Sequence, residues 1–315
     1  MSRVIDAVIQ LTDKFTAPMG HTIKAMAEAT AEGNRMRKSI ANAGKEIQNV
    51  GQGVTAAVTM PVIGAGVAFG KMASDFENGI AKVSTIADTS VMSMDQIKKA
   101  TLDVSNQLGV AVTDISEAQY SAISAGAATE KSLDLVSTAV RAAKAGFTDT
   151  ATAVDGLTTV YNSFGGAVDY EKLSDQMLQT QNYGKTTFGE LASSIGQVTP
   201  VANSLNVSTD ELFSSIAILT KNGIATSSAI TGLKAAYSNI LKPTSDASKT
   251  AKKLGLDFSA THLKAVGWAK FMEEVKEKTN GDADAMAKLF GSVEALNSMT
   301  VLAGAGLDDF NNCLG

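Results

Sequence analysis

Residues 47–70, IQNVGQGVTAAVTMPVIGAGVAFG, contain no charged side chain and separate two parts of the sequence that differ in character. Gly, Ala, Val and Thr make up most of this segment, and Pro61 interrupts it. An apolar stripe follows at the three- and four-residue spacing of one helix face. The stripe consists of Phe69, Met72, Phe76, Ile80, Val83 and Ala87. A segment of small residues therefore leads into an amphipathic helix, with a solvated arm before it and a helical core after it.

The composition favours a core of many short helices. The chain has 315 residues, of which 44% are hydrophobic but only 5% are aromatic. We therefore expect an aliphatic, Ala-rich core, in which small side chains let helices approach closely while burying less area per residue. The 27 glycines and 4 prolines favour short elements over long ones.

Charge and cysteine content exclude several classes of function. The formal net charge is -5, and no basic block is present, so we expect no sequence-specific nucleic-acid binding. Cys313 is the single cysteine, which rules out an intramolecular disulfide framework. Asp6 interrupts the apolar run that a signal peptide needs. We expect the chain to be made and kept in a reducing cytoplasm before use.

Three regions follow one another along the chain: an arm at 1–50, the Gly/Ala-rich segment with its amphipathic helix at 51–92, and a core at 93–315. Within the arm, Val4 to Leu11 predicts a short strand. Residues 19–50 predict a helix with a short coiled-coil seam that needs a partner helix. The seam residues are Met36, Ile40, Ala43, Ile47 and Val50.

The core begins its helices with recognisable signals. Capping boxes, in which a hydroxyl and a later Glu or Gln satisfy backbone N–H groups, are predicted from Ser93 to Gln96, Thr187 to Glu190 and Ser208 to Glu211. Pro243 and Gly255 bracket another helix. Since no strong strand follows residue 60, the sequence predicts an all-α fold of roughly ten short helices.

A faint internal repeat relates two parts of the core. With a shift of 97 residues, VSNQLGV at 104–110 lies on VANSLNV at 201–207, and Gly126 lies on Gly223. Apolar faces and helix starts then coincide as well. Two readings stay open: duplication of a three-helix unit (104–157 and 201–254) or chance similarity in a chain rich in Ala, Ser and Val.

No arrangement of residues predicts catalysis. The sequence Tyr183 to Thr186 has the second half of a phosphate loop, but Gln179 stands where its first glycine belongs. His21 and His262 are far apart, without zinc-ligand spacing, and we expect both on the surface. Asp282 and Asp284 read as the charged first turn of a helix. We expect no enzyme activity, no cofactor and no metal.

Residues 50–315 resemble the conserved core of phage tail tape measure proteins. The similarity begins with Thr59-Met60-Pro61, the Gly/Ala-rich segment and Asp75-Phe76-Glu77. It continues through LGVAVTDISEAQYSAISAG at 108–126, ELFSSIAILTKNGIATSSAITGLKAAYSNILKP at 211–243 and LAGAGLDDF at 302–310. Each of these segments is a pattern of apolar and small residues typical of helix packing. The resemblance depends on their order and spacing along the sequence.

The resemblance implies a structural protein of a bacteriophage or phage-derived particle. Members of the family lie in the lumen of the tail, guide its assembly and length, and leave it when the genome is delivered. The implied partners are the tail tube, the tail tip or baseplate and an assembly chaperone, with transient contact to the host membrane. Family members usually continue into long helical regions after this core, whereas the present sequence stops at NNCLG.

The role of residues 47–70 leaves two interpretations open. In the first, Gly66 and Gly70 allow close helix packing within the particle, and the stripe from Phe69 to Ala87 meets the same helix in other copies, in a trimer or another small ring. In the second, the segment enters a bilayer, since ~20 residues suffice for a helix to cross it. The protein would then be membrane-active, forming a pore or penetrating the envelope. A helical adhesin or signalling stalk is disfavoured, because regular heptads are absent from the first 50 residues.

Overall fold

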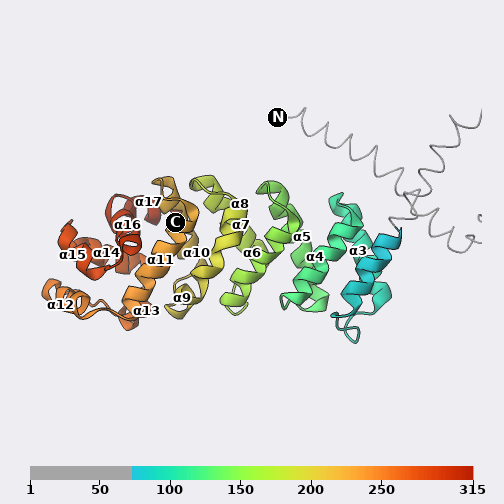
Figure 1. The fold of residues 1–315 in the computed structure, drawn as a ribbon, viewed down its shortest axis with the longest axis horizontal. Coiled ribbons are helices and arrows are strands. Elements are labelled where there is room, and N and C mark those ends of the chain that lie inside the picture. The colour runs from blue at the N-terminus through green and yellow to red at the C-terminus, as the bar shows by residue number, and fades with distance from the viewer. Residues whose placement is uncertain (1–72, 315) are drawn as a thin grey trace, which may run out of the picture. The chain divides into compact units, whose positions relative to one another are not determined.

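The computed structural model describes residues 73–314, and all regular structure in this range is helical (Figure 1). The prediction of an all-α core is therefore confirmed for the described residues. The predicted strand at 4–11, the arm to residue 50 and the segment at 47–70 lie outside this range.

The described helices are short and closely spaced. A first helix covers residues 73–84. The α-helices that follow are α3 (Met94–Leu108), α4 (Val112–Ser124), α5 (Ser132–Ala145), α6 (Thr150–Ser163), α7 (Tyr170–Tyr183), α8 (Phe188–Ser194), α9 (Thr199–Ser204), α10 (Thr209–Lys221), α11 (Thr226–Leu241), α12 (Ser245–Leu254), α13 (Ala260–Val266), α14 (Trp268–Thr279), α15 (Ala283–Leu289), α16 (Val293–Thr300) and α17 (Leu307–Leu314). Single 3₁₀ turns lie at η1 (Thr129–Lys131) and η2 (Ile195–Gln197), and a π-helical turn lies at η3 (Val301–Ala305). The expected ten helices were too few, because elements such as α9 and α13 are too short to show a periodic pattern.

These helices form two compact units. Unit 1 contains residues 73–82 and Asp95–Ser116, and unit 2 contains Val83–Met94 and residues 117–314. In unit 1, Ile80, Ile97 and Ile115 are buried together with Thr101. Gly79 permits a close approach there, since a Cβ at this position would lie 2.2 Å from the Ser116 Oγ. A small residue at 79 is therefore required by packing.

The buried side chains of unit 2 differ between its N-terminal and C-terminal halves. Helices α5, α6 and α7 pack against one another through aliphatic side chains such as Leu135, Leu157 and Leu173. In the C-terminal half, α10 packs against α7 and α17, and α11 packs along α16 (Figure 1). The buried aromatic side chains there are Phe213, Tyr237, Phe258, Trp268, Phe271, Phe290 and Phe310. Aliphatic side chains still make up most of the buried core in the C-terminal half, for example Leu219, Ile230 and Leu302, but most of the buried aromatics are concentrated there as well.

Several predicted helix boundaries are confirmed. Complete capping boxes begin α8 at Thr187 and α10 at Ser208. Gly255 ends α12 with a left-handed φ of 66°, and the Asp282 carboxylate caps the start of α15. These features are local in sequence, which is why they could be read without knowledge of the tertiary structure.

The 97-residue shift relates the bounds of two helices. Helix α4 covers 112–124, and adding 97 to each bound gives 209–221, the bounds of α10. The loops after them also correspond, since Gly126 and Gly223 have φ values of 99° and 91°. Downstream, α6 and α12 differ in length. The two parts of the core are therefore similar in helix bounds and in loop backbone geometry as well as in sequence. Duplication of a three-helix unit stays a prediction.

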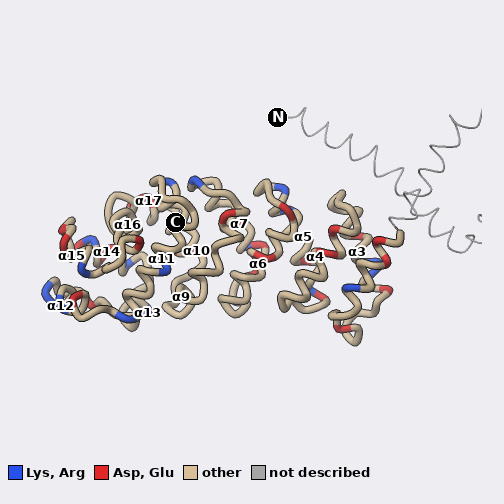
Figure 2. Tube along the Cα trace, in the orientation of Figure 1, with Lys and Arg blue, Asp and Glu red and all other residues tan. Residues whose placement is uncertain are grey.

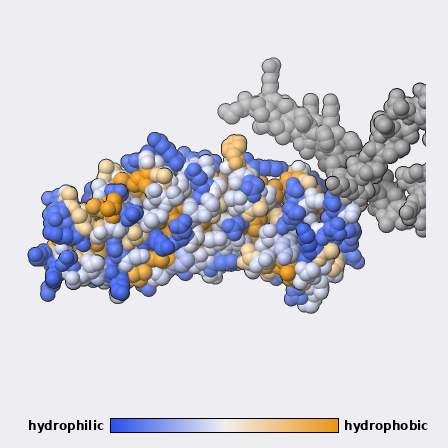
Figure 3. All heavy atoms as spheres, in the orientation of Figure 1, coloured by the Kyte–Doolittle hydropathy of each residue, from blue (hydrophilic) through white to orange (hydrophobic). Residues whose placement is uncertain are grey.

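The surface of the described residues is mixed in character. Acidic and basic residues are both scattered along the described helices among a majority of uncharged residues (Figure 2). On the face shown in Figure 3, hydrophobic residues form separate patches among hydrophilic ones. Surface charge therefore singles out no binding region in the described part of the chain.

Candidate packing and self-association site

The predicted self-association stripe is only partly described. Ile80 and Val83 are buried by the chain itself, at 2% and 0% exposure, whereas Phe76 and Ala87 are half-buried. The remaining members of the predicted site, Gly66, Phe69, Gly70 and Met72, lie outside the described residues. Within the described range, Phe76 is the large apolar member of the stripe that keeps an accessible side chain.

Glu211 joins the starts of two helices that are far apart in sequence. Its Oε2 accepts hydrogen bonds from the Ser208 backbone N–H at 2.9 Å and from the Ser208 hydroxyl at 3.0 Å, within the capping box of α10. Its Oε1 accepts from the backbone N–H groups of Trp268 and Ala269, at 2.9 and 3.1 Å. One carboxylate therefore satisfies donors at the N-termini of both α10 and α14, where a negative charge is favoured.

Trp268 lies beside this carboxylate and is fully buried. Its Nε1 donates to the Ser215 Oγ at 3.0 Å, and its ring contacts Tyr237 edge-on at 4.9 Å between centroids. Burial, together with the nearby Glu211 carboxylate, raises the pKa of Tyr237 well above its usual value, so this phenol is neutral. The cluster fixes α10, α11 and α14 relative to one another.

Glu190 has a related role at α8. It completes the capping box with Thr187, and its Oε2 accepts from the Thr226 hydroxyl at 2.9 Å, at the start of α11. The sequence predicted the capping-box roles of Glu190 and Glu211. It did not predict the second hydrogen bonds of these carboxylates, from Thr226 to Glu190 and from Trp268 to Glu211. Each second partner is 36 or more residues away, and no local pattern could have revealed it.

Glycines allow two close helix crossings in unit 2. A Cβ at Gly232 of α11 would lie 2.0 Å from the Ser298 Oγ and 2.6 Å from the Glu294 carbonyl oxygen, both in α16. A Cβ at Gly156 of α6 would lie 2.6 Å from the Ala192 Cβ in α8. Separations under 3.0 Å are incompatible with a side chain, so both helices need glycine at the crossing.

Replacing Glu211 with Ala should destabilise the purified chain by about 2–4 kcal/mol, since several helix-terminal N–H groups would lose their acceptor. Glu211→Gln keeps one oxygen acceptor and should lose about half as much. Denaturant unfolding measures both changes. As a matched control, the exposed Glu171, which pairs with Arg141 at 3.3 Å, should lose at most about 1 kcal/mol on replacement by Ala. Equal losses at Glu211 and Glu171 would contradict the bridging role.

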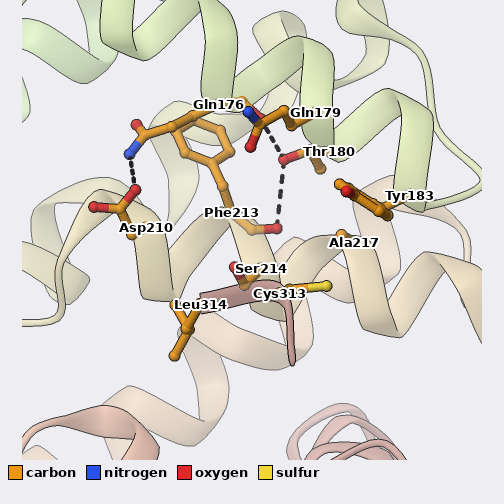
Figure 4. Close-up of a pocket in the computed structure, with 10 residues that line it drawn as sticks. All are labelled: Gln176, Gln179, Thr180, Tyr183, Asp210, Phe213, Ser214, Ala217, Cys313 and Leu314. Carbon is orange, nitrogen blue, oxygen red and sulfur yellow. Dashed lines mark hydrogen bonds between the residues drawn. The ribbon is translucent and has the colours of Figure 1, made fainter. Parts of the chain in front are cut away.

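A small pocket lies between α7, α10 and α17 (Figure 4). It has a volume of about 60 Å³ and is lined by Gln176, Gln179, Thr180, Tyr183, Asp210, Phe213, Ser214, Ala217, Cys313 and Leu314. Burial acts to raise the pKa of Asp210, but hydrogen bonds from Lys172 and Gln176 outweigh it and lower the pKa. Burial raises the pKa of the Cys313 thiol. The thiol is therefore in its neutral form near pH 7, and these groups show no arrangement for nucleophilic catalysis.

The described residues contain no cluster of His, Cys, Asp and Glu that could hold a metal ion. His262 is not the surface residue we expected: its side chain is 23% exposed and its Nε2 lies 2.6 Å from the Glu274 Oε2. The reason is that α13 folds back onto α14, which places the ring against Phe271. None of the described helices is both long and apolar enough to span a membrane. The bilayer interpretation concerns residues 47–70, outside this range.

Comparison with known proteins relates the chain to phage tails. A family model described as phage-related minor tail protein matches residues 98–291. The chain is 26% identical to the probable tape measure protein of Clostridium phage phiCD119, over 99% of this chain and 35% of that protein. It is 25% identical to the tape measure protein of Pneumococcus phage Dp-1, over 86% of this chain and 24% of that protein. The chain thus spans about a third and about a quarter of these relatives. No solved structure matches it.

Proposed function

The chain belongs to the phage-related minor tail protein family, and from this premise we propose that it is the folded core of a tape measure protein in the tail lumen. It has a structural role in a phage tail. In the proposal it guides assembly of the tail and leaves when the genome is delivered. The observation that carries the proposal is the family match across 98–291, which covers α4 to α15.

The proposal separates assembly from length measurement. A helix rises ~1.5 Å per residue, so a ruler needs long uninterrupted helices. In the described residues the longest α-helix is α11, with 16 residues, and successive helices fold back on one another. The core would therefore initiate assembly, and length would be set by the further regions that make the tape measure relatives three to four times longer than the part matched here.

In the proposed setting the partners are the tail tube, the tail tip or baseplate and an assembly chaperone. The chain would be made in the bacterial cytoplasm and then enclosed by the tube. Protease treatment of intact tails tests this location, since a lumenal protein is protected until ejection is triggered. Cleavage of the chain in intact tails at the rate seen after ejection would contradict it.

We further expect self-association through the helix at 73–84. Phe76 is half-buried in one copy, and the proposed contact with a second copy would cover it. Phe76→Asp should abolish the association, because an unpaired carboxylate in an apolar contact costs several kcal/mol. Sedimentation measures the change, with the exposed Glu77→Gln as control. A monomeric wild type at concentrations well above micromolar would exclude the contact.

A further inference from the structure

Two sets of helices in unit 2 follow one another at a spacing of 98 residues, one more than the shift described above. The first set is α7 to α10 and the second set is α14 to α17. Helices α7 and α10 begin at 170 and 209, and adding 98 gives 268 and 307, where α14 and α17 begin. In each set the first helix packs against the last, α7 against α10 and α14 against α17. The two sets are therefore similar in helix starts and in packing.

Buried positions agree between the two sets over most of their length. The pairs of positions 98 residues apart that are buried in both sets are Leu173 with Phe271, Met177 with Val275, Phe188 with Met286, Leu191 with Leu289, Ala192 with Phe290, Leu205 with Ala303 and Leu212 with Phe310. Equivalent positions thus have equivalent surroundings from the first helix of each set to the last. A position that departs from this agreement indicates a neighbour that one set has and the other lacks.

The departure is confined to one strip of α16. The first-set residues concerned are Ile195, Val198 and Ala202, all at 0% exposure. Their second-set counterparts, which we call the α16 strip, are Val293, Leu296 and Thr300. Val293 is 69% exposed, Leu296 is half-buried and Thr300 is exposed. Steps of three and four residues place the strip on one face of the helix, so these accessible side chains adjoin one another.

Two helices cover the equivalent face and its neighbour in the first set. Helix α6 contacts η2 and α9 through Gly196, Thr199 and Asn203. Helix α11, which follows α10 in the sequence, packs against η2 and α9 as well. The contacts of α6 take up one face, and the adjoining face with Ile195 and Ala202 is left for α11.

In the second set, α11 itself fills the place that α6 has in the first. Glu294 is the counterpart of Gly196, and its carbonyl oxygen lies against Gly232 of α11. At roughly 100° per residue, Glu294 and Ser298, which both meet Gly232, lie on a different face of α16 from the strip. The described residues end with α17, so none of their helices takes the place beside the strip that α11 has in the first set.

We propose that the α16 strip is the docking site of a further helix of the same protein, which follows α17 as α11 follows α10. The tape measure relatives are about three to four times as long as the part matched here, and they contain further sequence from which such a helix can form. We expect this helix to resemble α11, which has Lys234 as its one charged residue and buries Ala229, Gly232, Leu233 and Ala236. The proposal rests on the spacing of the two sets. It depends neither on a location in the tail lumen nor on Phe76.

A chain extended by a duplicate of its own residues tests the site. Residue 315 corresponds to 217, since 315 − 98 = 217, so a duplicate of residues 218–241 joined to Gly315 continues α17 and supplies a second α11 in register. The extended chain should unfold at a higher denaturant concentration than the original. Exchange of the α16 amide hydrogens should slow by at least about tenfold, because the strip becomes covered. The same added residues in scrambled order serve as control. An equal gain from the scrambled extension, or no gain from the ordered one, would overturn the proposal.

Val293→Asp shows whether the gain comes from the strip. Val293 is the first residue of α16, where a carboxylate suits the helix N-terminus, so the original chain should keep its stability. In the extended chain the same carboxylate would be covered without a partner, and the gain should be lost. Val91→Asp, at a position that is 57% exposed, is the matched control and should preserve the gain.

Sedimentation distinguishes this docking site from a contact between copies. If the strip bound a second copy, Val293→Asp would weaken the self-association of the original chain. We expect that association to be unchanged. A weakened association, or a gain in the extended chain that survives Val293→Asp, would contradict the proposed occupant.

Discussion

Replacing Gly232 with Ala should destabilise the protein by about 3 kcal/mol, measured by denaturant unfolding. In an ordinary helix interior the same change stabilises by about 0.5–1 kcal/mol, because Gly is the poorer helix former. Here the new Cβ would lie 2.0 Å from the Ser298 Oγ and 2.6 Å from the Glu294 carbonyl, so α11 and α16 must separate. The sign of the change thus distinguishes close packing from helix propensity.

A second substitution refines this test. Ser298→Ala removes the Oγ at 2.0 Å but leaves the backbone carbonyl at 2.6 Å, so it should recover part of the loss in the Gly232→Ala variant. Ser238→Ala, at an exposed position of the same helix, serves as the control and should change stability by at most about 0.5 kcal/mol. A stabilised Gly232→Ala variant would show that the two helices are not closely packed.

Trp268→Ala should cost about 3–5 kcal/mol, the usual range for removing a large buried aromatic. The loss includes the contact with Tyr237 and the hydrogen bond to Ser215, whose hydroxyl would then lack a donor. Thermal or denaturant unfolding gives the value. The expected loss is large because Trp268, at the start of α14, contacts α10 through Ser215 and α11 through Tyr237.

Two controls belong with this measurement. Trp268→Phe keeps an aromatic ring but lacks the indole N–H, so it should lose clearly less than Trp268→Ala. Val293→Ala truncates a side chain that is 69% exposed and should stay within about 0.5 kcal/mol of the wild type. A loss at Trp268→Ala no larger than that at Val293→Ala would refute the account of the buried cluster.

Features within a few residues of one another could be predicted from the sequence. The capping boxes at Thr187 and Ser208 are examples, since the hydroxyl and the glutamate act within one turn. The glycine that ends α12 is another, because Gly255 adopts the left-handed backbone without a side-chain clash. The all-α fold followed from many such signals that agreed with the apolar spacing.

Features that depend on distant residues could not be predicted. From the sequence alone, Gly232 is only a poor helix former within a predicted helix. The structure shows that α16, more than 60 residues later, crosses α11 at this glycine. Phe147 reads as an ordinary apolar residue after a glycine, and only the φ of 53° and the exposure show otherwise. Two residues of the predicted self-association stripe, Ile80 and Val83, are buried by contacts within the same chain, so they need no second copy to cover them.

The role of the core in tail assembly is tested by the number and length of tails, seen by electron microscopy, after an in-frame deletion within residues 94–255. Removing α10 and α11, residues 209–241, deletes the helices against which α7, α16 and α17 pack. If these residues form the core that initiates assembly, the deletion abolishes tails, whereas deletions in long helical regions elsewhere in the full protein shorten them. Tails of normal number and reduced length after the core deletion would contradict the account.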